Sequence, residues 1–482
     1  MEGPQRLSLL ELLLPGGRAA QIQVIGSACP AALAAPAGTR GAGEPPDLLV
    51  IAPSDAESRE PGWLTTACGG SLSEEGVAYL LVPRAHRRRA RGLLRVRGLE
   101  VEQAILHLPD VAESRQLVPL ERAPARHAFR SVVPLVPWKR AVAELLLALG
   151  GGGLIASAAS SVALVARRPG ARPLLEWLPL SAAAGARRSA VISTSAKPGG
   201  AGVVLQPFAA GAGPLVAKLS LRPAFDPSDE HRRLMRLAPD AARAGAAVPR
   251  PMGELRLHGN AVLLESRVEG EIVAPLLSRR PARLGLMLGR VCSWLESWQR
   301  LTASRVRLTR EQLEGEVVAP ARELAPRLDG ADAYLNALAE RCSAAEGTVV
   351  PLTASHNDLT MWNVLTDGAR LGVVDWEVAE EGTLPLKDFY YAAADAVAAT
   401  RRYADRPAAV RECFGNHGGH EHTIAPLQAS LARAGGVSAE LADLSFHACW
   451  LGHAVNEARS AGPADPTPFR EVVQWLVRRE AA

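Results

Sequence analysis

The run SHNDLTMWNVLTDGARLGVVDWE, which begins at Ser355, constrains this chain more than any other segment. It places His356, Asp358 and Asn363 in the pattern HxDxxxxN, and Asp375 follows a short apolar stretch. An Asp-Gly pair flanked by apolar residues lies between Asn363 and Asp375, and this pattern predicts a β-hairpin. The hairpin would bring these polar groups to one place, so we expect a single site there.

The chemistry of these side chains suits phosphoryl transfer, in which a protein mainly aligns a γ-phosphate with a hydroxyl and neutralises charge through Mg²⁺. Asp358 would accept the proton of the hydroxyl or orient it. Asn363 and Asp375 offer the oxygen ligands that Mg²⁺ prefers. We expect His356 to hold the backbone of the loop beside the reacting groups.

Lysine is rare in this chain, because only four of the 54 basic Lys and Arg residues are lysines. One of them, Lys218, lies in the apolar run PLVAKLS. This run is the third of three predicted strands, 189–196, 203–208 and 214–220, separated by glycine-rich turns as in an antiparallel meander. A helix is predicted from Asp226, where Asp and Ser provide the cap. Two more strands follow within 253–268.

This order of elements, with HNDLTMWN and the Asp-Trp-Glu strand end, resembles the aminoglycoside phosphotransferase and choline kinase family. The resemblance covers residues 185–460 and implies an α+β fold of the bilobal protein-kinase type, with ATP and Mg²⁺ as cofactors. It also implies that Lys218 contacts the α- and β-phosphates and that Glu230, or alternatively Asp229, aims this lysine. Asp388 would support the catalytic loop.

The same resemblance assigns a nucleotide role to further residues. Gly199 and Gly200 lie in the turn KPGGAG, which has no GxGxxG pattern and is equally explained by turn chemistry. Glu265 and Arg267 lie in LESRV, the expected hinge, where backbone groups would meet adenine. The implied domains are a nucleotide-binding lobe at 181–275 and a helical lobe at 276–482.

Residues 1–180 read as a separate α/β, Rossmann-like domain that precedes the kinase-like lobes. Strands predicted at 46–53, 76–83 and 99–108 alternate with helices, which indicates a mostly parallel sheet. This succession resembles the back half of a class I S-adenosylmethionine methyltransferase. Gly26 is followed by SACPAAL instead of GxGxxG, so we expect no complete cofactor site in this domain.

We therefore predict a small-molecule kinase that moves the γ-phosphate of ATP to a hydroxyl. Aminoglycoside, amino sugar, choline-like and polyol acceptors fit equally. The alternatives are a catalytically silent kinase-like binding module and a methyltransferase with a kinase-like appendage. The retention of Lys218, Asp358, Asn363 and Asp375 argues against the silent module.

Composition excludes other classes of function. The net charge of +4 over 482 residues gives no case for nucleic acid, and the basic run HRRRAR is interpreted as the solvated face of a helix. Six scattered cysteines without a CxxC pair indicate reduced thiols and a cytoplasmic protein. The N-terminus lacks the pattern of a signal peptide.

Three further segments have structural interpretations. The uncharged stretch 145–166 is long enough to span a bilayer, but it contains four consecutive glycines. It is therefore expected to form a buried helix, a tight turn and a strand. His417, His420 and His422 lie near Cys413 in a glycine-containing segment, which we interpret as a substrate-side or surface loop in preference to a metal site. Trp294 and Trp298, four residues apart, are expected in the core.

Overall fold

The computed structural model divides the chain into two compact units. The first, here called the sheet unit, comprises Met1–Asp229 and Pro251–Arg267, and the second, the helical unit, comprises Glu230–Arg250 and Val268–Ala482. The structure describes residues 8–27, 45–54, 57, 62–63, 65, 72–108, 115–132, 137–183, 186–194, 202–220, 228–415, 418–460 and 467–480.

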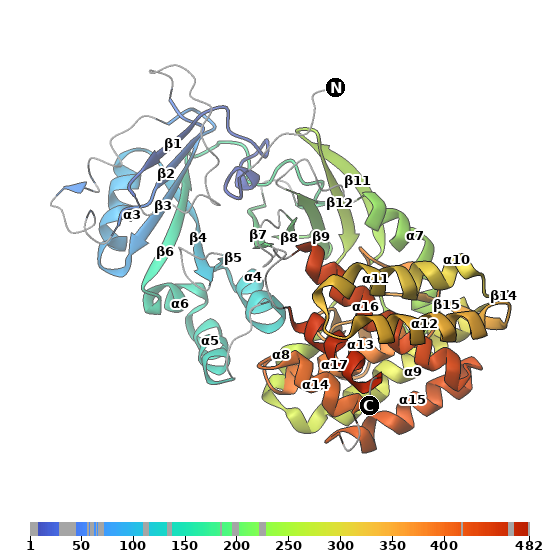
Figure 1. The fold of residues 1–482 in the computed structure, drawn as a ribbon. Coiled ribbons are helices and arrows are strands. Elements are labelled where there is room, and N and C mark those ends of the chain that lie inside the picture. The colour runs from blue at the N-terminus through green and yellow to red at the C-terminus, as the bar shows by residue number, and fades with distance from the viewer. Residues whose placement is uncertain are drawn as a thin grey trace. The chain divides into compact units, whose positions relative to one another are not determined.

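The sheet unit is built on one sheet of eleven strands in the order β1-β2-β3-β6-β4-β5-β7-β8-β9-β12-β11 (Figure 1). The strands are β1 Ile22–Ile25, β2 Leu48–Ile51, β3 Val77–Pro83, β4 Glu100–Leu108, β5 Gln116–Pro119, β6 Ser161–Arg167, β7 Arg188–Thr194, β8 Gly202–Ala209, β9 Leu215–Ser220, β11 Pro251–Leu257 and β12 Asn260–Ser266. The helices described in this unit are α3 Arg87–Val96, α4 Arg122–His127, α5 Pro137–Gly150 and α6 Gly152–Ala158.

The prediction of a mostly parallel sheet is wrong. Among the strands that the structure describes in this sheet, the pairs β1–β2 and β2–β3 are parallel and the others are antiparallel. Strand β6 lies between β3 and β4, antiparallel to both. Apolar runs did not reveal this direction, because β6 is covered on both faces: Ala163 and Val165 join one buried cluster, and Leu164 and Ala166 join another. A strand covered on both faces is apolar whichever way its neighbours run.

The second half of the sheet follows the prediction. Strands β7, β8 and β9 form an antiparallel meander, and β11 and β12 form an antiparallel pair beside β9. Strand β5 also pairs with β7, through Gln116 opposite Ser193 and Leu117 opposite Ile192. Strands on both sides of the boundary predicted near residue 180 therefore belong to one sheet, and that boundary stays a prediction.

The uncharged stretch 145–166 forms the end of α5, then α6, then β6, with the turn at Gly151, where φ is +60°. The helix, turn and strand are confirmed, but the helix is not buried: Leu145 is 57% and Leu149 is 72% exposed. Within the described ranges, no helix has both the length and the apolar character needed to cross a membrane.

The helical unit contains most of the chain's long helices and two small sheets (Figure 1). Its helices are α7 Ser228–Arg243 (from Glu230 on), α8 Val273–Arg279, α9 Leu284–Thr302, α10 Arg310–Leu313, α11 Ala319–Leu324, α12 Ala331–Ala345, α13 Lys387–Thr400, α14 Arg406–Phe414, α15 Glu421–Gly435, α16 Ala439–Ser460 and α17 Pro468–Glu480. Its strands are β10 Ala246–Ala247, β13 Glu271–Ile272, β14 Ser304–Arg307, β15 Val349–Ser355, β16 Val364–Thr366, β17 Leu371–Val373 and β18 Glu380–Thr383.

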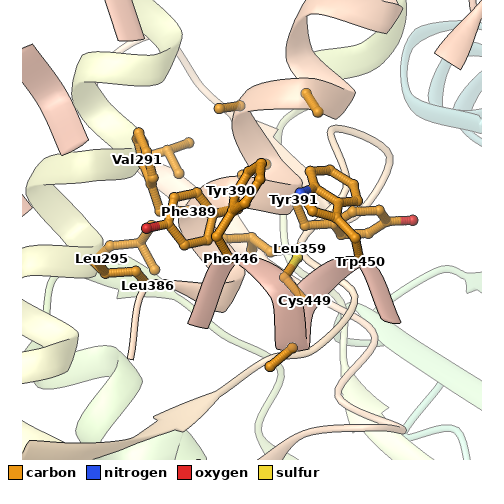
Figure 2. Close-up of a cluster of buried hydrophobic side chains, with 14 of the residues drawn as sticks. Val291, Leu295, Leu359, Leu386, Phe389, Tyr390, Tyr391, Phe446, Cys449 and Trp450 are labelled. Carbon is orange, nitrogen blue, oxygen red and sulfur yellow. The ribbon is translucent and has the colours of Figure 1, made fainter. Parts of the chain in front are cut away.

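One large apolar core fills the helical unit. Trp294 and Trp298 on α9 are stacked, with ring centroids 5.8 Å apart, and both are buried, as predicted. Figure 2 shows another part of this core, where aromatic residues of α13 and α16 surround Leu359. Because Leu359 lies between His356 and Asn363 in sequence, this packing anchors the loop 356–363 on the helices below it.

Burial of His447 on α16 predicts that the helical unit is sensitive to acid. Burial, followed by the nearby Arg341 cation, lowers the pKa of His447 from 6.5 to about 4, and the Tyr334 hydroxyl lies 2.8 Å from its Nδ1. The unfolded chain therefore takes up this proton first as the pH falls, and stability is lost between about pH 6.5 and pH 4. At pH 5 the expected loss is about 2 kcal/mol.

Urea unfolding at pH 7.5 and pH 5.0 measures this contribution. Between these two pH values, the free energy of unfolding of His447→Gln should fall by about 2 kcal/mol less than that of the wild type. His422→Gln, at an exposed histidine of α15, should behave like the wild type. An equal loss in wild type and His447→Gln would contradict the assignment.

Candidate active site

The polar residues of the run from Ser355 lie around the β16–β17 hairpin of the helical unit. The hairpin is antiparallel, with Val364 opposite Val373. Its turn is closed by Asp367, whose Oδ1 accepts hydrogen bonds from the N–H groups of the two residues 369–370 at 2.8 and 2.7 Å. At the open end, the N–H of Val374 donates to the carbonyl oxygen of Asn363 at 3.0 Å. Asn363 and Asp375 therefore flank the same end of the hairpin.

Asn363 joins the hairpin to the base candidate. Its Nδ2 donates to the backbone oxygen of Asp358 at 2.9 Å and to the Oδ2 carboxylate oxygen of Asp358 at 3.0 Å. This orientation turns the amide N–H₂ toward Asp358 and leaves the amide oxygen, the atom that binds hard cations, for another partner. The buried Asn363 thus fixes the half-buried Asp358 carboxylate.

Asp375 adopts an unusual backbone conformation, with φ at +69°. This left-handed region is uncommon for residues other than glycine, and such conformations gather at functional sites. The next residue, Trp376, is fully buried, and its Nε1 donates to the carbonyl oxygen of Val373 at 3.1 Å. The buried indole fixes the chain after β17 and so holds Asp375 in this conformation.

His356 contacts the hairpin and not a reacting group. Its Nε2 lies 3.0 Å from the carbonyl oxygen of Val374, and its ring lies edge-on to Trp376 with centroids 4.8 Å apart. His356 is fully buried. These contacts are those that a backbone-holding role requires.

Helix α13 presents two buried carboxylates to the loop 356–363. Asp388 accepts hydrogen bonds from the N–H groups of His356 and Asn357 at 2.7 and 2.8 Å. Burial raises the pKa of the Asp388 carboxyl above its usual value, and the His356 side chain and the two N–H groups oppose this. Asp395, seven residues further along the same helix face, accepts the N–H of Met361 at 2.7 Å.

Sequence reasoning identified Asp388 but missed Asp395. The signal was available, because Asp395 is the one charged residue within the apolar stretch FYYAAADAVAA. A buried acid in such a helix needs donors, and the structure supplies two, the Met361 N–H and the Tyr403 hydroxyl at 3.0 Å. The Arg406 guanidinium adds an ion pair at 3.9 Å. Burial raises the pKa of Asp395, and Arg406 opposes this.

In the sheet unit, Lys218 on β9 forms an ion pair with Glu265 on β12, with Nζ 3.0 Å from Oε1. The side chain of Glu265 was not expected to matter, yet it is 3% exposed and touches the lysine. Arg267 lies with its guanidinium 4.8 Å from the Phe208 ring centroid, and its N–H donates to the Pro214 carbonyl oxygen at 3.1 Å. The backbone N–H of Arg267 is therefore hydrogen-bonded within the sheet unit, and its role at a nucleobase stays a prediction.

The remaining predicted residues have different outcomes. Glu230 is buried in the first turn of α7 and belongs to the helical unit, so its pairing with Lys218 stays a prediction, and Asp229 is exposed. Gly199 and Gly200 lie outside the described residues, as does His417. His420 and His422 lie at the start of α15.

The described residues contain no group of three or more His, Cys, Asp or Glu side chains arranged to hold a metal ion. Mg²⁺ does not require one, because proteins commonly bind it through one or two carboxylates together with substrate phosphates and water. The carboxylate of Asp375 and the amide oxygen of Asn363 fit that smaller set.

A cavity of about 450 Å³ in the helical unit reaches the start of the loop at Asn357 and Asp388. Both basic side chains of its lining form ion pairs. Arg459 pairs with Glu323, which also lines the cavity, at 2.7 Å, and Lys387 pairs with Glu316, which does not line it, at 3.1 Å. The carboxylates of Glu380 and Asp388 also line the cavity, so its lining holds three acidic and two basic side chains.

Part of the chain is similar to a known protein family. Residues 208–427, less than half of the chain, match the model of the phosphotransferase enzyme family (APH). No curated protein matches the chain. Similar solved structures include a thermostable mutant of aminoglycoside phosphotransferase APH(4)-Ia, with 15% identity over 60% of this chain and 96% of that chain and a TM-score of 0.39.

Two more solved structures are similar to this chain over comparable lengths. A choline/ethanolamine kinase family protein from Mesorhizobium loti has 19% identity over 60% of this chain and 86% of that chain, with a TM-score of 0.33. The aminoglycoside phosphotransferase APH(3'')-Id from Streptomyces rimosus has 17% identity over 53% of this chain and 91% of that chain, also with a TM-score of 0.33. The chain is therefore similar to the phosphotransferase enzyme family over residues 208–427.

Proposed function

We propose that the chain is an ATP- and Mg²⁺-dependent phosphotransferase that moves the γ-phosphoryl group to a hydroxyl of a small molecule. The observation that carries the proposal is the contact between Asn363 Nδ2 and Asp358 Oδ2 at 3.0 Å, at the hairpin end that also bears Asp375. In this proposal Asp358 is the base, and Asn363 and Asp375, which flank one end of the hairpin, supply the two oxygen ligands. The phosphotransferase family domain over residues 208–427 supports the same reaction class.

In the proposed mechanism, Asp358 takes the proton from the acceptor hydroxyl while the oxygen of that hydroxyl forms a bond to the γ-phosphorus. The bond between that phosphorus and the bridging oxygen breaks, and ADP leaves with the electron pair. Asp375 and the Asn363 amide oxygen would hold Mg²⁺, which neutralises phosphate charge when bound. Lys218 binds the α- and β-phosphates.

The remaining residues position these groups. His356, Asp388 and Asp395 bind backbone atoms of the loop and hairpin, and this fixes the direction of Asp358. Such positioning matters because a misplacement of about 1 Å can cost about 100-fold in rate. The acceptor would occupy the cavity beside Asn357 and Asp388, whose polar lining suits a molecule with several hydroxyl or amino groups.

Thermal unfolding with ligands tests the proposal. MgATP should raise the melting temperature, since a ligand of the folded state stabilises it, whereas S-adenosylmethionine should not. Stabilisation by the methyl donor alone would favour a methyltransferase. If neither ligand raised the melting temperature, the support for a nucleotide site would be removed. A screen of hydroxyl compounds for stimulated ADP release then identifies the acceptor.

Replacing Asp375 should weaken the binding of MgATP itself. We expect Asp375→Ala to raise the Kd of MgATP about tenfold or more, because one charged ligand of the metal is lost. In EDTA the two proteins should bind ATP alike. Asp367→Asn, at the exposed turn of the same hairpin, keeps an acceptor oxygen for that turn and is the matched control. Unchanged MgATP affinity in Asp375→Ala would remove this residue from the metal site.

A further inference from the structure

Glu265 is a buried carboxylate on the sheet face that carries Lys218. Strands β12 and β9 pair with Leu263 opposite Lys218, so Glu265, two residues further along, points to the same face. The alternating residues Val262 and Leu264 pack in the apolar core of the other face. Glu265 is therefore not part of that core, although its side chain is only 3% exposed.

The two carboxylate oxygens of Glu265 differ in their surroundings. Oε1 lies 3.0 Å from the Nζ of Lys218. Oε2 is buried and has no hydrogen-bond partner in the described part of the chain. A buried acceptor without a donor is costly, most of all on an ionised group. This arrangement favours a site in which a bound molecule supplies the missing donor.

The position of Glu265 limits which part of a nucleotide could donate a hydrogen bond to Oε2. Glu265 directly precedes the segment 266–267, where the nucleobase is expected, and it touches the lysine expected at the phosphates. A nucleotide bound along this face would therefore pass Glu265 with its base end near the carboxylate. Adenine offers the N–H of its 6-amino group at the edge that faces such a segment, whereas guanine offers a 6-oxo acceptor there.

We propose that Glu265 is a specificity-determining residue that selects adenine by accepting a hydrogen bond from the 6-amino group at Oε2. This inference rests on the proposed function. Guanine could satisfy a carboxylate through its N1–H and 2-amino groups together, but that pairing needs two available oxygens. Lys218 engages Oε1, so a single oxygen remains, and this fits the single donor of adenine.

Equilibrium binding of three Mg-nucleotides tests the inference: ATP, GTP and purine riboside 5′-triphosphate, which is ATP without the 6-amino group. The wild type should bind ATP about tenfold or more tightly than either of the other two, as expected for one hydrogen bond to a charged group. In Glu265→Met, ATP and the purine analogue should bind within about twofold of each other. Glu265→Gln keeps an acceptor oxygen and should retain part of the preference.

The control variant is Glu254→Gln, at an exposed glutamate of the neighbouring strand β11, which should leave the ATP preference unchanged. Equal binding of ATP and the purine analogue by the wild type, or a preference that survives in Glu265→Met, would overturn the inference while leaving the proposed function intact. Failure of the wild type to bind any of the three nucleotides would overturn both. The comparison of ligands on the wild type does not depend on the variants being folded.

Discussion

Asp358→Asn is expected to lower the turnover number about 10³-fold, while the Kd of MgATP changes by less than about threefold. The substitution preserves the shape of the side chain, and its amide oxygen still accepts the hydrogen bond from Asn363 Nδ2. It removes the group that takes the hydroxyl proton, and general-base catalysis contributes about 10²–10⁴-fold. Ground-state binding of the nucleotide does not use that proton transfer, so affinity should survive.

The release of ADP from MgATP with water as the acceptor measures this effect before any natural acceptor is identified. Asp367→Asn changes an aspartate of the same segment at the exposed hairpin turn and should retain the wild-type rate. A wild-type rate in Asp358→Asn would show that Asp358 is not the base. A loss of MgATP affinity equal to the loss in rate would instead indicate a binding role.

Local sequence signals predicted the parts of the fold that short-range chemistry decides. The Asp367-Gly368 pair marked the turn of the β16–β17 hairpin, and its Oδ1 closes that turn. Glycine-rich turns between apolar runs likewise marked the meander β7–β8–β9. The spacing in HNDLTMWN sufficed to predict that residues 358 and 363 belong to one site, because both lie in one tight loop.

Features that depend on distant segments were not predicted. The insertion of β6 between β3 and β4 pairs residues that are between 58 (Ile105 with Ala163) and 90 (Val77 with Arg167) positions apart in sequence, and alternation of apolar residues does not encode such pairing. The contact of Glu265 with Lys218 depends on the register of β12 against β9. Asp395 was missed because its partners come from two other segments, the loop 356–363 and residues 403–406.

Replacing Asp388 is expected to lower both the stability of the helical unit and the turnover number. Its carboxylate, 5% exposed, is the acceptor for two consecutive backbone N–H groups, those of His356 and Asn357. Asn357 has φ at +61°, a conformation that needs support from its surroundings. Asp388→Ala leaves two buried donors without an acceptor, at about 1–3 kcal/mol each.

We therefore expect Asp388→Ala to lower the free energy of unfolding by about 4 kcal/mol. Asp388→Asn retains one acceptor oxygen and should lose about half as much. Tryptophan fluorescence during urea unfolding suits the measurement, because six of the nine tryptophans, all after residue 290, lie in the helical unit. Asp443→Asn, at a half-exposed aspartate of α16, should lie within about 0.5 kcal/mol of the wild type.

Turnover separates a role in positioning from a role in folding alone. If Asp388 sets the direction of Asp358 through the backbone of residues 356–357, Asp388→Asn should fold at 25 °C yet lose about 100-fold in turnover number, with the KM for ATP changed by less than about threefold. A variant that loses stability but keeps its turnover number would confine Asp388 to the fold. A parallel rise in KM would mean that the loop also shapes the nucleotide site, and the carboxylate would then act on binding and not on the direction of the base.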